Sequence, residues 1–158
     1  MAFLTQEQRR GSRLALVALG ATVLFVSLLW YCYDASTPAN YCSRMVVKLN
    51  RSVDPEALRQ AAGGLVRKYA EGQRHIVSES EQPEPVRRVM KSLGLAEAAV
   101  GEGATPGQRV LSMAAPGGFA SYGVVVAPPG AALVVPTKKP GLTVLKWGDG
   151  IYVFYFTS

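Results

Sequence analysis

The longest apolar stretch of the chain lies near its N-terminus. No charged residue occurs from Leu14 to Tyr33, a run of twenty residues rich in Leu and Val. A helix of this length spans about 30 Å, the hydrocarbon thickness of a bilayer. Apolar cores of signal peptides usually have about 7–15 residues, so the run predicts a retained transmembrane helix. Trp30 and Tyr31 near its end are typical of an aromatic belt at the membrane interface.

The charges around this run predict its orientation. Three basic residues precede it and only Glu7 opposes them, whereas Asp34 is the first charge after it. The basic residues are Arg9, Arg10 and Arg13. Basic residues favour the cytoplasmic side of a membrane. We therefore expect a cytoplasmic tail at 1–13, a transmembrane helix at 14–33, and a periplasmic or extracellular remainder, as in a single-pass protein of a cell inner membrane.

The hydrophobic pattern changes to amphipathic helices in the soluble part. Residues 54–72 begin with Asp-Pro, which suits an N-cap and the first helical position, and continue with apolar residues at helical spacing. The pair Gly63-Gly64 either splits this helix or allows close packing against a sheet. A second, shorter helix is predicted from Pro85 to the vicinity of Gly94.

Short apolar runs between turn residues predict a mostly antiparallel sheet of four to six strands. Candidate strands lie at 44–50, 75–80 and 109–115, and two hairpins are predicted within 122–136 and 142–156. The first hairpin would turn at Pro129-Gly130, and the second at Gly148-Asp149-Gly150. Residues 96–108 are rich in Gly and Ala and predict a strand end followed by an irregular loop.

The last predicted strand, 151–156, is apolar on both faces. We expect helices to cover both sides of it, because burial is the usual fate of such runs. The alternative is that one aromatic face meets a partner or the membrane surface. The residues of this candidate partner surface are Trp147, Tyr152, Phe154 and Phe156.

Charge and length limit the function further. The formal net charge is +6, and +4 of it belongs to residues 34–158, which are enough for one small domain. The basic residues are spread along the chain, with no run longer than a pair. Nucleic-acid-binding domains concentrate positive charge in one patch, so we expect no nucleic-acid partner. We expect the basic residues to form a solvated surface, and weak attraction to an anionic membrane surface or cell-wall polymer is the alternative.

Residues that carry chemistry are few. His75 is the only histidine, and the acids Glu79, Glu81 and Glu84 lie just before the second helix, where the helix dipole favours them. No nucleophile elbow, phosphate loop or metal-ligand spacing is present. We therefore predict no catalytic residue, no cofactor and no metal.

Two features of the anchor region leave alternatives open. Cys32 and Cys42 pair if the chain folds back at the membrane surface, and otherwise they are free thiols or bridge two molecules. Ala15, Ala18 and Thr22 share one face of the apolar helix, where small residues allow close packing against another membrane helix.

Together these patterns predict an α+β protein. It would consist of the transmembrane helix, a juxtamembrane linker at 34–43, and a domain at 44–158 in which one or two helices pack on a mostly antiparallel sheet. The expected function is that of a non-enzymatic envelope protein, an accessory or structural component of a membrane complex. Its partners would be the lipid bilayer and another envelope protein or a second copy of the chain.

Two other functions remain open. One is a membrane-tethered domain that binds or hydrolyses cell-envelope material. It would need a cleft that joins His75 or the acids of residues 79–84 to Arg87 or Arg109. The other is a secreted domain that is released by cleavage near Thr37-Pro38-Ala39.

Overall fold

A computed structural model describes residues 6–35, 37–103, 106–115, 120–131 and 140–157, with side chains except those of 6–16, 18, 34 and 35. The chain forms two compact units, Met1–Thr37 and Pro38–Ser158. The second unit begins six residues before the domain start that we expected at residue 44.

The first unit contains one long helix, α1 (Gln6–Ala35). All large apolar side chains described in it are exposed, from 54% at Leu29 to 72% at Leu24. Within the residues whose side chains the structure describes, no single helix is both long enough and apolar enough to cross a bilayer. The segments Leu19–Tyr33 and Pro38–Ser52 meet these requirements only when they are taken together.

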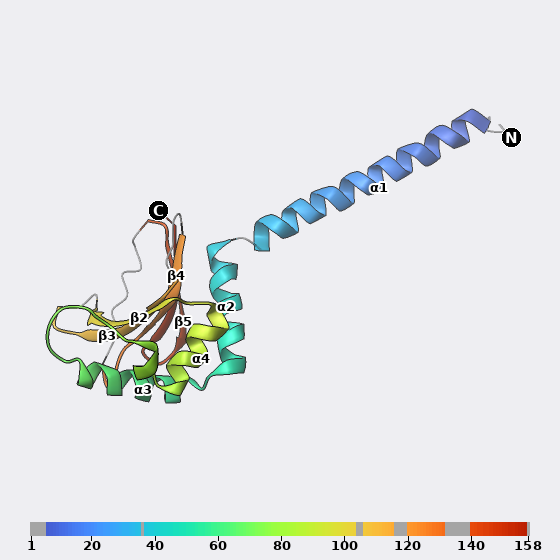
Figure 1. Ribbon diagram of the computed structural model, residues 1–158. Coiled ribbons are helices and arrows are strands. Elements are labelled where there is room, and N and C mark those ends of the chain that lie inside the picture. Colours follow the sequence, from blue (N-terminus) through green and yellow to red (C-terminus); the bar gives the residue numbers. More distant parts are fainter. Residues whose placement is uncertain (1–5, 36, 104–105, 116–119, 132–139, 158) are drawn as a thin grey trace. The chain divides into compact units, whose positions relative to one another are not determined.

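The second unit is an α+β domain built on a six-stranded antiparallel sheet, which confirms the predicted fold class in its coarser form (Figure 1). The strands lie in the order β1-β2-β3-β4-β6-β5. Their bounds are β1 His75–Ile76, β2 Glu97–Glu102, β3 Arg109–Ala114, β4 Ala120–Val126, β5 Leu142–Gly148 and β6 Ile151–Thr157. Because β6 pairs with both β4 and β5, the C-terminal strand is inserted between two strands that precede it in the chain.

Helix α2 (Pro38–Ser52) was not predicted. Its residues Cys42, Met45 and Leu49 recur at helical spacing and are buried. The prediction of a strand at 44–50 is therefore wrong. The expected linker at 34–43 is also mostly helical, since α1 ends at Ala35 and α2 begins at Pro38.

Helix α3 (Pro55–Lys68) confirms the first predicted helix, although it ends at Lys68 and not near Gly72. Asp54 is the N-cap, and its side chain accepts a hydrogen bond from the backbone N–H of Glu56. Gly63 is buried, and a Cβ atom there would lie 2.8 Å from Cδ of Pro129. The glycine pair therefore leaves the helix continuous and allows close packing against the segment that follows β4.

Helix α4 (Glu84–Leu93) confirms the second predicted helix, and Gly94 ends it in the left-handed conformation with φ 66°. A short 3-10 turn, η1 (Glu79–Glu81), precedes it. Strand β2 occupies the first part of residues 96–108, where we expected a strand end followed by an irregular loop, and it extends to Glu102.

The second predicted hairpin is confirmed as β5 and β6. The turn of the first predicted hairpin has the geometry of a type II turn. The N–H of Ala131 donates to the carbonyl of Pro128 at 3.1 Å, and Gly130 has φ 80°. Residues 132–136 of this hairpin lie outside the described part of the chain. The observed neighbours of β4 are β3 and β6.

The hydrophobic core lies on one face of the sheet, where Figure 1 shows α2, α3 and α4 grouped together. Alternate residues of the strands supply its sheet side. They include Val100, Leu111, Met113, Val124, Ile151 and Val153, each at most 1% exposed. The three helices therefore leave the other face of the sheet uncovered by any described helix.

Candidate functional site

The face of the sheet that no described helix covers carries a row of aromatic side chains from β6. Tyr152, Phe154 and Phe156 alternate with the buried Ile151 and Val153 and are only partly buried. The expectation that helices cover both faces of this strand is therefore wrong for the described helices.

Side chains of the neighbouring strands extend this row. Tyr152 lies opposite Val125 of β4 and Lys146 of β5, and Phe154 lies opposite Gly123 and Val144. We use the name aromatic face for the set Val125, Leu142, Val144, Tyr152, Phe154 and Phe156. Large partly exposed apolar side chains on adjacent strands are typical of a surface that meets another molecule.

Gly123 shapes the middle of the aromatic face. It is buried, and a Cβ atom at this position would overlap the carbonyl oxygen of Met113 on β3. Only glycine allows β3 and β4 to approach this closely. Phe154 is thereby paired with a position that has no side chain.

Trp147 is separate from the other three residues of the predicted partner surface. It packs against the core on the helix face, and its Nε1 donates to Oδ1 of Asn50 on α2 at 2.7 Å. The cause is a bulge in β5, because Lys146 and not Trp147 pairs with Tyr152. A regular two-residue hairpin would have placed Trp147 opposite Tyr152, and one extra residue moves its side chain to the other face.

A groove of about 790 Å³ lies between α4 and the segment around η1. It brings together Glu79, Glu84 and Arg87 but not His75 or Arg109. The carboxylate of Glu84 accepts hydrogen bonds from Arg88 at 2.9 Å and from Arg87 at 3.0 Å. The bond from Arg88 is the main cause of a lowered pKa at Glu84. This acid is therefore held ionised.

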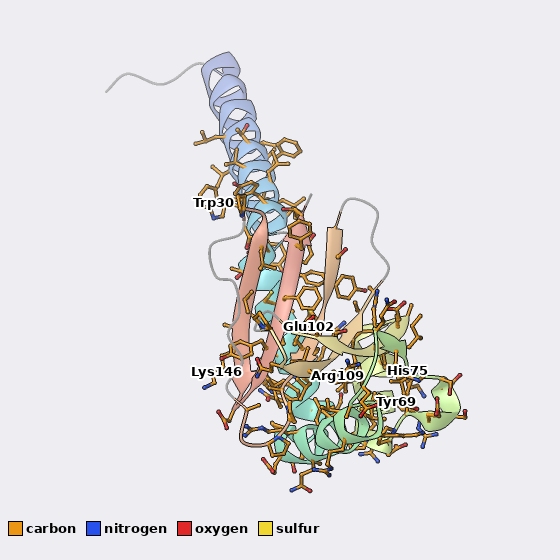
Figure 2. All side chains as sticks on the ribbon, turned by 90° about the vertical axis from the view of Figure 1, so that its left-hand side faces the viewer. Trp30, Tyr69, His75, Glu102, Arg109 and Lys146 are labelled. Carbon is orange, nitrogen blue, oxygen red and sulfur yellow. The ribbon has the colours of Figure 1, made fainter. Side chains whose placement is uncertain are left out.

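His75 belongs to a different cluster at the end of α3. Its ring stacks on Tyr69 with 3.8 Å between centroids, as Figure 2 shows for these two labelled side chains. The carboxylate of Glu81 accepts hydrogen bonds from Lys68, Tyr69 and Ser78. These three bonds lower the pKa of Glu81, and the bond from Lys68 has the largest effect. The bond between Lys68 and Glu81 also raises the pKa of Lys68 to about 12. The cluster joins α3 to η1 and contains no carboxyl group that would keep its proton at neutral pH.

Arg109 lines a second pocket of about 530 Å³. Its guanidinium donates to the carbonyl of Gly72 at 2.7 Å and to that of Gln73 at 3.3 Å. Glu102, labelled with Arg109 in Figure 2, accepts from the N–H of Gly107 at 2.9 Å. The bonds from Arg109 hold the loop after α3 against the start of β3, and the bond to Glu102 connects the end of β2 with the segment before β3. Both roles are structural.

Cys32 is exposed and Cys42 is fully buried, and both are free thiols in the structure. The thiol of Cys42 faces the carbonyl of Thr143 at 3.9 Å, and burial raises its pKa. A disulfide would require Cys42 to leave the core. Within the described residues, no group of three or more metal-ligating side chains occurs. In the predicted helix-packing face, the side chains of Ala15 and Ala18 lie outside the described residues and Thr22 is exposed.

Comparison with models of known protein families, with curated proteins and with solved structures gives no match. The case for a function therefore depends on the residues of this chain.

Proposed function

We propose that the protein is a single-pass membrane protein of the cell envelope whose α+β domain contacts another envelope protein or a second copy of the chain. The observation that carries this proposal is the exposure of α1. Its described large apolar side chains are all exposed by 54% or more, and the consecutive residues Val23 to Val26 distribute them around the helix. A helix that is apolar all round is stable when protein or lipid surrounds it.

The orientation follows from the sequence. The uncharged run from Leu14 to Tyr33 is twenty residues long, and basic residues precede it. We therefore propose a cytoplasmic N-terminus and a domain outside the cytoplasm.

We assign the partner contact to the aromatic face. Its central residues, Tyr152 and Phe154, are partly exposed although their strand is paired on both sides, with β4 and with β5. Aromatic side chains at the centre of an interface commonly supply most of its binding energy. The groove beside α4 is more polar, and its charges are largely paired with one another.

Co-purification tests this role. Full-length protein is extracted from native membranes with a mild detergent, and the mass of the complex and its chains are determined. We expect a second chain, either another protein or a further copy, and we expect Phe154→Ser to remove it. The matched control is Ile76→Ser, because Ile76 is 59% exposed on the short edge strand β1. A lone wild-type monomer, or a complex unaffected by Phe154→Ser in a folded variant, would contradict the proposal.

A second candidate function is ligand binding in the groove beside α4. The groove joins Glu79, Glu84 and Arg87, three of the groups that a cleft for envelope material was expected to contain. Hydrolysis would need a carboxyl group that keeps its proton, and the pKa of Glu84 is lowered. Calorimetry with soluble cell-wall fragments tests binding, and Lys91→Ala in the groove lining should weaken it. Absence of heat with the wild type would reject this candidate.

A further inference from the structure

Helix α2 has a positively charged outer side. Arg44, Lys48 and Arg51 are exposed, and Val47 between them is 51% exposed. At 100° per residue these four side chains occupy a sector of about 100°. We call this set the basic stripe of α2. The residues of the opposite side are in the core, with Cys42 and Leu49 at 0% exposure.

The cations of the basic stripe form no ion pair with any acidic side chain that the structure describes. Helix α2 contains no Asp or Glu. Elsewhere in the domain exposed arginines and lysines do form ion pairs, such as Lys68–Glu81 and Arg88–Glu84. Over the part of the chain that the structure describes, no ion pair involves Arg44, Lys48 or Arg51. Three uncompensated charges on one side of a helix attract an anionic surface.

The position of α2 in the chain indicates which surface this is. Pro38 follows Tyr33 by five residues, so the start of α2 lies within about 18 Å of the end of the uncharged run. A basic residue close to an anionic membrane surface contributes roughly fivefold to partitioning onto that surface. An exposed valine among them adds the apolar contact that interfacial helices make with the acyl boundary.

We propose that the basic stripe of α2 binds the anionic phospholipid headgroups of the bilayer that holds α1. This inference rests on the proposed membrane anchor. It adds that the domain lies with one defined side against the membrane. The aromatic face belongs to the sheet and not to α2, so it is left for a protein partner.

The experiment uses full-length protein with Cys32→Ser and Val47→Cys, labelled at position 47 with the environment-sensitive dye NBD. Cys42 is 0% exposed and should not react. The protein is reconstituted into vesicles of phosphatidylcholine, with or without phosphatidylglycerol. We expect a blue shift of the emission in the anionic vesicles and its loss in high salt.

Variants identify the residues responsible. The triple substitution R44Q/K48Q/R51Q should abolish the blue shift. The matched control R67Q/K91Q/K146Q removes the same charge from exposed positions outside α2 and should keep it. Circular dichroism verifies that both variants are folded.

The outcomes separate this inference from the anchor. Protein that floats with neutral vesicles but shows no lipid-dependent shift, or keeps the shift in R44Q/K48Q/R51Q, would overturn the inference and leave the anchor standing. A shift that appears in native membranes but not in phosphatidylglycerol vesicles would assign the stripe to a protein partner and overturn it as well. Protein that fails to float with neutral vesicles would overturn the anchor and this inference together.

Discussion

The indole N–H of Trp147 donates to Oδ1 of Asn50 at 2.7 Å, which connects the edge strand β5 to α2. The two residues are 97 positions apart in the chain. Cys42 of α2 also faces Thr143 of β5, so α2 is held along this strand at two points. The bond depends on the bulge that turns Trp147 toward the helices.

The contribution of this bond can be measured with a double-mutant cycle. Asn50→Ala and Trp147→Phe should each lower the free energy of unfolding by about 0.5–1.5 kcal/mol, because each leaves one partner without its hydrogen bond. The double variant should cost less than the sum of the two. Urea unfolding of the full-length protein in a mild detergent supplies the values. Additive effects would mean that the bond does not contribute.

The neighbouring glycines of α3 should respond in opposite ways to alanine. Nothing lies within 4 Å of a Cβ atom at Gly64, so Gly64→Ala should stabilise the protein by about 1 kcal/mol through helix propensity. At Gly63 the Cβ atom would lie 2.8 Å from Cδ of Pro129. Gly63→Ala should therefore destabilise it by about 1–3 kcal/mol. Equal effects in thermal unfolding would contradict the close packing of α3 on this proline.

Gly123 should not tolerate a side chain. An added Cβ would overlap the carbonyl oxygen of Met113, so Gly123→Ala should cost about 3 kcal/mol or more and reduce the yield of folded protein. Gly101→Ala on β2 is the control, because its nearest neighbour, Cγ of Arg74, is at 3.6 Å and makes an ordinary contact. A folded Gly123→Ala variant with wild-type stability would disprove the described pairing of β3 and β4.

Glu81 should make stability depend on pH in the acid range. Its pKa is lowered in the folded protein, first by the bond from Lys68. Its stabilising effect is therefore present above the unfolded pKa of about 4.3 and is lost as pH falls toward the folded value. The pKa of Lys68 is raised to about 12. The stabilisation from the Lys68–Glu81 ion pair is therefore lost at alkaline pH only above about pH 10.

Unfolding of Glu81→Gln across the pH range tests this. The variant should be less stable than the wild type at pH 7, and the difference should shrink below about pH 4. Glu71→Gln removes the same charge from an exposed position near α3 and is the matched control. A difference that stays constant from pH 7 to pH 3 would contradict the role of the cluster.

The sequence predicted the elements that local signals define. Asp54 caps a helix through its side chain, and Gly94 at a helix end and the Gly-Asp-Gly turn before Ile151 act through their backbone conformation, so each signal is local. Helix α2 was missed because its β-branched pair Val46-Val47 resembles a strand. The helical spacing of its buried residues becomes visible only from Pro38 onward.

The candidate site was predicted only in part, because its geometry depends on non-local pairing. The alternation of β6 correctly placed Tyr152 and Phe154 on one face. The insertion of β6 between β4 and β5 has no local signal, and neither does the bulge that separates Trp147 from Tyr152. The basic stripe of α2 was hidden for a related reason, since Arg51 shares a side with Arg44 and Lys48 only if the segment is helical.

The central claim is that α1 holds the chain in a membrane with the domain outside the cytoplasm. The most direct measurement treats spheroplasts of cells that express the doubly tagged full-length protein with protease, followed by a carbonate wash of the membranes. We predict that the tag after Ser158 is digested and that a short fragment with the N-terminal tag stays in the membrane pellet. A C-terminal tag protected from the protease, or an N-terminal tag in the carbonate supernatant, would contradict the account.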